Sequence, residues 1–179
     1  MEEKEFIQNL LNPKTQNHAF QKLLLDYQRP LYNHIRNIVL NHDDSDDVLQ
    51  NTFVKVFQNL KNFKGESKLF SWMYRIATNE AITYINKKAK QNGSSSEFLK
   101  TKITDNLEAD SHFDGNAIQL KLQKAIVNLP EKQQLVFKMR YFEEIKYEEM
   151  SEILGTSVGA LKASYHHAVK KIEIFMIKD

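Results

Sequence analysis

Apolar residues recur at three- and four-residue steps along most of this chain, and little interrupts them. Its 179 residues include only three prolines and five glycines. Such spacing places apolar side chains on one face of a helix, whereas a half-buried strand alternates with a period of two. No convincing two-residue alternation is present. The pattern therefore predicts an all-α protein.

The first half predicts three long helices. The apolar residues of the first are Phe20, Leu23, Leu24, Tyr27, Leu31, Ile35 and Ile38. Pro30 implies a break or kink in it, because proline lacks a backbone N–H. A polar turn over residues 41–47 should lead into the second helix, with an apolar face made by Val48, Leu49, Thr52, Phe53, Val56, Phe57 and Leu60. The third covers about residues 70–88.

Residues 91–116 break this pattern. They contain a serine run, two glycines, and five anions against two lysines. Their few apolar residues cannot offset the entropy of ordering, and so long a loop is uncommon inside one compact domain. We therefore predict two small helical domains, residues 1–90 and 117–179, joined by a flexible acidic linker at residues 91–116.

The second half returns to helical spacing with Ile118, Leu122, Ala125, Ile126 and Leu129. Pro130 should open a further helix, whose buried face is predicted to be Leu135, Val136, Met139 and Phe142. A short helix over residues 146–154 should stop at Gly155. Ser157 is a good N-cap for a final helix that reaches about residue 178.

Several classes of protein are disfavoured by composition. There are no cysteines, which excludes disulfides, thiol nucleophiles and cysteine-based zinc sites. The acidic start MEEKEFIQNL is unlike a signal peptide, and no run of about 18 apolar residues suggests a membrane span. The histidines lack ligand spacing, and no nucleophile elbow or P-loop is present. We expect a soluble cytoplasmic protein without membrane insertion, metal or cofactor, and not an enzyme.

Residues 61–90 are basic and rich in aromatic side chains. They carry seven cations against two anions, with Phe63, Phe70, Trp72, Tyr74 and Tyr84 interspersed. Cations neutralise phosphates and aromatic faces stack on exposed bases, which is the chemistry of single-stranded nucleic-acid binding. The alternative is a solvated surface helix whose rings belong to the core.

The order of residues in this segment resembles the promoter-melting segment of bacterial RNA polymerase sigma factors, in the extracytoplasmic-function (ECF) group of the sigma-70 family. The matching positions are Phe63, Gly65, Ser67, Trp72, Arg75, Ile76, Ala77 and Asn79. The resemblance implies that the −10 element is bound and melted by Phe63, Lys64, Gly65, Ser67, Trp72, Arg75 and Asn79. Trp72 is equally suited to core packing.

Four aspartates, at positions 43, 44, 46 and 47, precede the predicted second helix. Simple helix capping explains them, because carboxylates are favoured at a helix N-terminus. A magnesium site is a sharper alternative, but a solvated turn without distal partners rarely makes one. The run DDVLQNTFVKVF also resembles the family's docking helix for the polymerase clamp, which implies that core polymerase is contacted by Asp47, Gln50 and Phe53.

The run YEEMSEILGTSVGALKASYHHAVKKI fits a helix-turn-helix with its turn at Gly155. An ordinary helical hairpin with a basic end is the alternative. The run resembles the sigma domain that reads the −35 element, and the implied DNA-binding residues are Ser157, Lys162, Ser164, His166, His167 and Lys170. Family members more often carry arginine near Ala163, Ser164, His167 and Val169, so we expect phosphate contacts and DNA shape to supply much of the affinity.

The resemblance extends over residues 20–90 and 118–172 and implies a sigma factor with regions 2 and 4. Such a protein binds core RNA polymerase, directs it to promoter DNA and helps to open the duplex for transcription initiation. An anti-sigma factor is a further implied partner. Two rival hypotheses are a free-standing helix-turn-helix transcriptional regulator and a metal-dependent phosphohydrolase built on residues 43–47.

Overall fold

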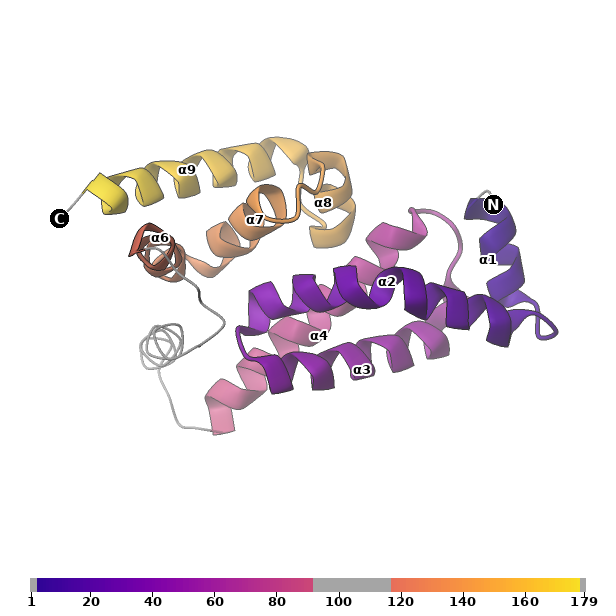
Figure 1. The fold of residues 1–179 in the computed structure, drawn as a ribbon. Helices are drawn as coiled ribbons and strands as arrows, with labels where there is room; N and C mark the ends of the chain where they lie inside the picture. The colour runs from indigo at the N-terminus through magenta and orange to yellow at the C-terminus, as the bar shows by residue number, and fades with distance from the viewer. Residues whose placement is uncertain (1–2, 92–116, 178–179) are drawn as a thin grey trace. The chain divides into compact units, whose positions relative to one another are not determined.

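The computed structural model describes residues 3–91 and 117–177, and all regular structure within these ranges is helical (Figure 1). The predicted all-α class is confirmed. The described chain up to Ile85 forms one compact unit, and most of the residues that follow form a second. The predicted linker lies outside the described residues, apart from Gln91, which ends a helix.

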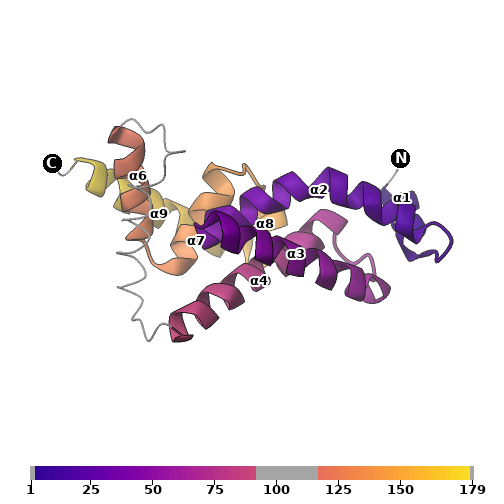
Figure 2. The same cartoon turned by 60° about the horizontal axis from the view of Figure 1, so that its bottom comes forward.

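The first unit contains α1 (Glu3–Leu11), α2 (Gln16–Val39), α3 (His42–Asn59), the 3-10 turn η1 (Leu60–Asn62) and α4 (Leu69–Gln91). Helices α2 and α3 lie side by side (Figures 1 and 2). Helix α4 packs on both through side chains. His34 of α2 and Thr78 of α4 are buried with Nε2 and Oγ1 2.8 Å apart, and Lys55 of α3 meets Glu80 of α4.

The core of the first unit follows the predicted spacing. Its most deeply buried side chains include Leu23, Leu31, Ile35, Val56, Leu60, Leu69 and Met73. Within each helix they recur at helical intervals, which places them on one face. Phe57 departs from the prediction, because it remains 42% exposed. Its ring instead packs edge-on against Phe20, with centroids 5.0 Å apart.

Helix α2 continues through Pro30, so of the expected break or kink, the break is not found. An internal proline costs about 3 kcal/mol or more, because a backbone hydrogen bond is lost and the ring crowds the preceding turn. Leu31 and Ile35, just beyond the proline, are fully buried. Their packing offsets the local cost.

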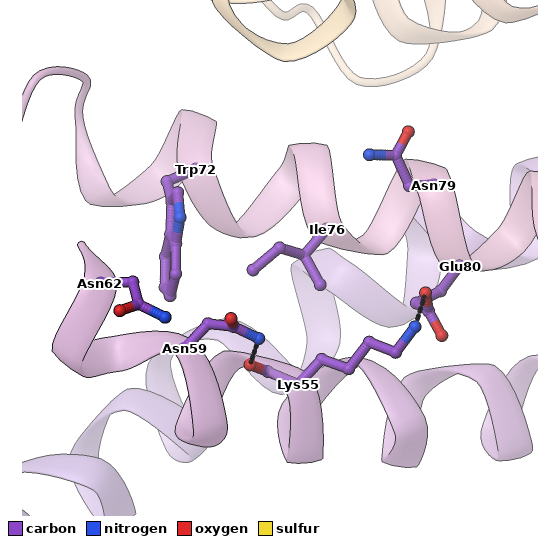
Figure 3. Close-up of a pocket in the computed structure, with 7 residues that line it drawn as sticks. All are labelled: Lys55, Asn59, Asn62, Trp72, Ile76, Asn79 and Glu80. Atoms are coloured by element: carbon purple, nitrogen blue, oxygen red, sulfur yellow. Dashed lines mark hydrogen bonds and ion pairs between the residues drawn. The ribbon is translucent and has the colours of Figure 1, made fainter.

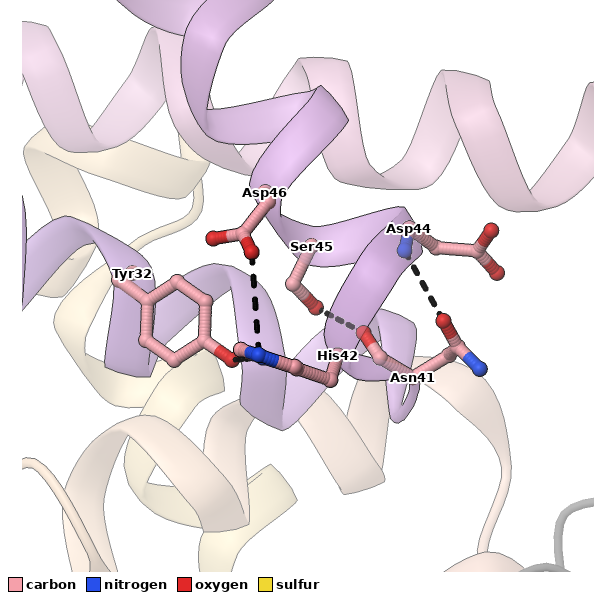
Figure 4. Close-up of polar contacts among 6 residues, drawn as sticks. All are labelled: Tyr32, Asn41, His42, Asp44, Ser45 and Asp46. Atoms are coloured by element: carbon pink, nitrogen blue, oxygen red, sulfur yellow. Dashed lines mark hydrogen bonds and ion pairs between the residues drawn. The ribbon is translucent and has the colours of Figure 1, made fainter.

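Helix α3 begins at His42, so the predicted polar turn over residues 41–47 is wrong for all but its first residue. Asn41 is the N-cap, and its side-chain oxygen accepts a 2.9 Å hydrogen bond from the backbone N–H of Asp44 (Figure 4). Asp43 and Asp44 then occupy the first turn, where the helix dipole favours carboxylates. The aspartates therefore start the helix instead of preceding it.

The second unit contains α6 (Ala117–Val127), α7 (Glu131–Tyr141), α8 (Tyr147–Leu154) and α9 (Val158–Ile177). Its core cluster joins α6, α7 and α9 through Ala125, Ile126, Leu129, Phe137, Ala168 and Ile172. One predicted buried residue is wrong, because Phe142 is 41% exposed and Phe137 is buried in its place. Helix α7 ends at Tyr141, and Phe142 is its C-cap, with a backbone N–H that donates to the Lys138 carbonyl at 3.0 Å.

Candidate nucleic-acid and polymerase interfaces

The loop between η1 and α4 is held at both ends. The Phe63 backbone N–H donates to the Leu60 carbonyl at 3.0 Å, and the buried Phe63 ring lies 4.9 Å from that of Trp72. Gly65 adopts φ +71°, a left-handed conformation that strains most other residues. At the far end, Leu69 N–H donates to the Glu3 carboxylate of α1 at 2.8 Å. The loop is therefore preformed, and exposed Lys64 lies on it.

A pocket of about 310 Å³ opens between α3 and α4 (Figure 3). Its lining consists of Lys55, Asn59, Asn62, Trp72, Ile76, Asn79 and Glu80. The indole of Trp72 descends from α4 toward Asn62 and forms one wall, and Ile76 lies beside it. Apart from these two side chains the lining is polar.

The polar side of the pocket is ordered by two contacts. Lys55 Nζ donates to Glu80 Oε1 at 2.5 Å, with the lysine side chain 50% and the glutamate side chain 17% exposed. Asn59 Nδ2 donates to the backbone carbonyl of Lys55 at 2.8 Å. The Asn79 amide points away from Lys55 (Figure 3). The pocket therefore combines one apolar wall, made by Trp72 and Ile76, with a cation, a carboxylate and amides.

The structure gathers only part of the residue set predicted for the −10 element. Trp72 and Asn79 line the pocket, and Phe63 supports the indole. Gly65 and Ser67 lie in the adjoining loop, and Arg75 is exposed on α4. Sequence reasoning missed the remaining lining residues, which are Lys55, Asn59, Asn62, Ile76 and Glu80. The i, i+4 spacing of Trp72, Ile76 and Glu80 was the available signal.

The predicted polymerase-docking residues lie on α3 but differ in exposure. Asp47 and Gln50 are exposed and three residues apart, so they share one face. Phe53 is only 9% exposed and belongs to the core. An incoming protein can therefore contact Asp47 and Gln50, whereas Phe53 supports the helix beneath them.

The start of α3 is a network of polar contacts (Figure 4). The Tyr32 hydroxyl and His42 Nδ1 are 2.5 Å apart, and His42 Nε2 lies 3.9 Å from the Asp46 carboxylate. The Tyr84 hydroxyl of α4 donates to Asp44 at 2.5 Å. This hydrogen bond, followed by burial and the charges of Asp44 and Asp47, raises the pKa of Tyr84 to about 12.

These contacts bear on the magnesium hypothesis. Within residues 3–91 and 117–177, no three histidine, cysteine, aspartate or glutamate side chains form a group suited to a metal ion. Asp44 instead braces α4 through Tyr84, and Asp46 lies beside His42. Asp43 and Asp44 lie in the first turn of α3, and Asp44 also joins α3 to α4 through Tyr84. No helix in the described part of the chain is long and apolar enough to cross a membrane.

The second unit contains the predicted helix-turn-helix. Gly155 closes α8 at φ +63°, and its N–H donates to the Ser151 carbonyl at 2.9 Å. Ser157 caps α9, because its hydroxyl oxygen accepts from the Ala160 N–H at 3.3 Å. Both features match the turn and N-cap expected from the sequence.

Helix α9 presents most of the residues predicted to meet the −35 element. Lys162, His166, His167 and Lys170 are exposed, and Ser164 is half-buried. The Tyr147 ring of α8 lies near two cations, with its centroid 5.7 Å from Lys162 Nζ and 5.2 Å from the Arg140 guanidinium. Sequence reasoning missed Arg140, because only the fold brings α7 to this ring.

Each of the two units matches the model of a known protein family. Residues 23–91 match the family model for Sigma-70 region 2, and residues 119–172 match that for Sigma-70, region 4. The two matches together cover well over half of the chain.

Named relatives match over most of their length. The ECF RNA polymerase sigma-E factor of Haemophilus influenzae is 26% identical over 165 residues, covering 87% of this chain and 86% of the relative. The ECF RNA polymerase sigma factor SigW of Bacillus subtilis is 29% identical over 156 residues, covering 83% of each.

Solved structures share the fold. CnrH, determined in complex with the cytosolic domain of CnrY, superposes with a TM-score of 0.70 at 19% identity and covers 99% of this chain and 98% of its own. RpoE of Bartonella quintana, in complex with the anti-sigma factor NepR, gives a TM-score of 0.66 at 18% identity, covering 89% and 98%. With regions 2 and 4 matched in order and ECF factors among its relatives, this chain belongs to the sigma-70 family of RNA polymerase sigma factors, in the ECF group.

Proposed function

We propose that this chain binds core RNA polymerase and directs it to specific promoters, as an ECF sigma factor acting in the cytoplasm. The single observation that carries the proposal is the pocket between α3 and α4, beside a preformed basic loop in the unit that matches region 2. Chemistry at the growing RNA belongs to the polymerase, and we assign no enzymatic activity to this chain.

In this function the pocket receives a base that leaves the −10 duplex. Extruding a base costs a few kcal/mol, which stacking and edge contacts must offset. The Trp72 face offers stacking, and the Phe63 ring supports the indole at a centroid distance of 4.9 Å. Lys64 and Ser67 in the loop are assigned to the backbone that enters the pocket, and Asn79 to a base edge at its rim.

Docking to polymerase is assigned to the exposed polar face of α3. Asp47 and Gln50 lie on it, anchored by the buried residues on the opposite side of the helix. A polar patch on a rigid support suits a protein interface whose specificity comes from complementary charge and hydrogen bonds. Phe53 maintains this surface from within.

Recognition of the −35 element is assigned to the N-terminal half of α9. A recognition helix enters the major groove with its first turns, which favours Lys162, Ser164 and His166 over residues near the C-terminus. The Tyr147 ring beside Lys162 limits the lysine's freedom before DNA arrives. Arg140 supplies a further cation for phosphate.

Regulation by an anti-sigma factor is the remaining part of the proposal. Both solved structures named above are complexes, one with the cytosolic domain of CnrY and the other with the anti-sigma factor NepR. We infer a partner of the same kind for this chain, because it shares their fold over most of its length.

Run-off transcription with purified core polymerase tests the function. The core alone should give no specific transcript, and adding this chain should give transcripts that start at defined promoters. A free-standing regulator would bind DNA without conferring such starts on the core. Failure to form a complex with core polymerase would refute the sigma-factor assignment.

A further inference from the structure

Glu80 is an unexpected residue in a pocket assigned to nucleic acid. Within residues 61–90 it is one of two anions among seven cations. Its side chain is 17% exposed and lines the pocket, with the carboxylate directed toward Lys55 (Figure 3). A carboxylate repels phosphate, so general affinity for DNA does not explain its position.

The chemistry of the carboxylate restricts what it can bind. An ionised carboxylate only accepts hydrogen bonds, at about four lone-pair sites, and Lys55 supplies one donor. Glu80 lines a pocket whose other side chains include amides and an indole wall. A ligand that fills this space must therefore present N–H groups to Glu80, or leave its acceptor sites unmatched at a cost.

The four DNA bases differ in this respect. Adenine, cytosine and guanine each carry an exocyclic amino group, whereas thymine carries only carbonyl oxygens at its edges, apart from one ring N–H between them. Thymine can donate only this ring N–H, and the carbonyl oxygens on either side of it then lie close to the carboxylate, which brings acceptors together. An exocyclic amine placed there makes a hydrogen bond to a charged group.

We propose that Glu80 is a specificity-determining residue of this pocket, which selects an unpaired base that carries an exocyclic amino group and rejects thymine. The inference rests on the proposed function of the pocket as a base site. Lys55 positions the carboxylate and balances its charge, so that the phosphate of the entering nucleotide is tolerated nearby.

A purely structural role for the pair makes a different prediction. If the ion pair only braces α3 against α4, then breaking it from either side should affect all bases alike. Glu80→Gln breaks the pair and replaces the carboxylate by an amide that both donates and accepts. Lys55→Met breaks the same pair but leaves the carboxylate in place. The two variants are therefore matched controls for each other.

The experiment uses holoenzyme assembled from core polymerase and the full chain. Promoter fragments with a randomised −10 region are first selected by run-off transcription to supply a working sequence. Forked probes of that sequence, with the non-template strand unpaired, then carry thymine or 5-methylcytosine at each −10 position in turn. These two bases share the 5-methyl group and differ in the amino group against carbonyl oxygen at position 4, with the matching change at N3.

At one position, wild-type holoenzyme should bind the 5-methylcytosine probe at least roughly tenfold more tightly than the thymine probe, as a hydrogen bond to a charged group implies. Glu80→Gln should reduce this ratio to within about threefold, and Lys55→Met should retain most of it. Thermal unfolding of each variant verifies that the fold is intact.

Equal binding of both probes by the wild type at every position overturns the inference, whether or not the variants fold. The inference is also overturned if Glu80→Gln leaves the preference for 5-methylcytosine over thymine unchanged, or if Lys55→Met removes it equally. Either result would mean that the ion pair only braces α3 against α4. If the proposed sigma-factor function is itself wrong, the result is different: the holoenzyme yields no promoter-specific transcript to select.

Discussion

Glu3 accepts a 2.8 Å hydrogen bond from the backbone N–H of Leu69, so the first helix of the chain caps the fourth. The first N–H groups of a helix have no partner within it, and a carboxylate there also meets the positive end of the helix dipole. The contact fixes the end of the loop that carries Lys64 and Gly65. It connects residues 66 positions apart.

Replacing Glu3 should destabilise the first unit. Glu3→Ala removes the cap of α4 and should lower the free energy of unfolding by about 1 kcal/mol, as measured by urea denaturation. Glu5→Ala is the matched control, since Glu5 is also exposed in the first turn of α1. Equal losses in the two variants would contradict a specific role for the Glu3–Leu69 contact.

Replacing the exposed polar residues of α3 should weaken polymerase docking. Asp47→Ala with Gln50→Ala should reduce affinity for core polymerase in a titration while the helical circular dichroism signal remains unchanged. Asp26→Ala with Gln28→Ala removes one exposed aspartate and one exposed glutamine from α2 instead. The docking assignment fails if both double variants bind the core as the wild type does.

Substitutions in the loop and at the pocket rim should impair promoter opening more than initial binding. Lys64→Ala, Ser67→Ala or Asn79→Ala leaves the core intact, because none of the three is buried. Each should lower the yield of open complex, measured by permanganate reactivity of unpaired thymines, with closed-complex affinity changed much less. Lys61→Ala, another exposed lysine nearby, serves as control. Unaltered permanganate patterns would reject the loop assignment.

Helix α9 should bind the −35 DNA with a strong dependence on salt. Lys162→Ala should weaken holoenzyme binding to a −35 duplex and lower the slope of log K against log salt by about 1. The double variant His166→Ala/His167→Ala should also weaken binding to this duplex, because both side chains are exposed on α9.

The control for α9 is Lys132→Ala, which removes an exposed lysine from α7. It should leave both the affinity and the salt slope nearly unchanged. If Lys162→Ala behaves like this control, and the histidine variant binds as the wild type does, α9 is not the helix that contacts DNA.

The hydrogen bond from Tyr84 to Asp44 should be visible in an alkaline titration. The folded-state pKa of about 12 lies above the ordinary value of 10.0, so this tyrosine contributes stability below pH 10 that is lost as pH rises toward 12. Asp44→Ala should lower the pKa of Tyr84 toward 10. Ultraviolet absorbance of phenolate, taken as the difference from Tyr84→Phe, measures the shift, and an unchanged titration would refute the contact.

The helices that span many turns were predictable because one apolar face repeats along each of them. The third predicted helix, about residues 70–88, corresponds to α4 at Leu69–Gln91. Gly155 and Ser157 were predictable for a different reason, since each has a specific local role at a helix end. In these cases sequence neighbours alone determine the structure.

The predictions from sequence fail where contacts between distant residues, or a single helix cap, determine the structure. Helix α1 is short, with Leu10 as its only buried residue, so it has no repeated pattern to detect. Asn41 shifts the start of α3 to His42 through one side-chain hydrogen bond. Lys55 and Glu80 are 25 residues apart, and only the packing of α3 on α4 makes them a pair. The spacing of Trp72, Ile76 and Glu80 indicates one wall of the pocket, but the opposite wall comes only from that packing.

Trp72 is the single tryptophan of the 179 residues, and its indole forms a wall of the pocket. Tryptophan emission in the isolated chain therefore originates entirely at the surface on which a base would stack. Stacking of a nucleobase on an indole quenches its fluorescence, whereas a strand that binds elsewhere leaves the emission unchanged. The fluorescence of Trp72 therefore reports pocket occupancy without an added label, and it does not respond to DNA bound at the −35 side.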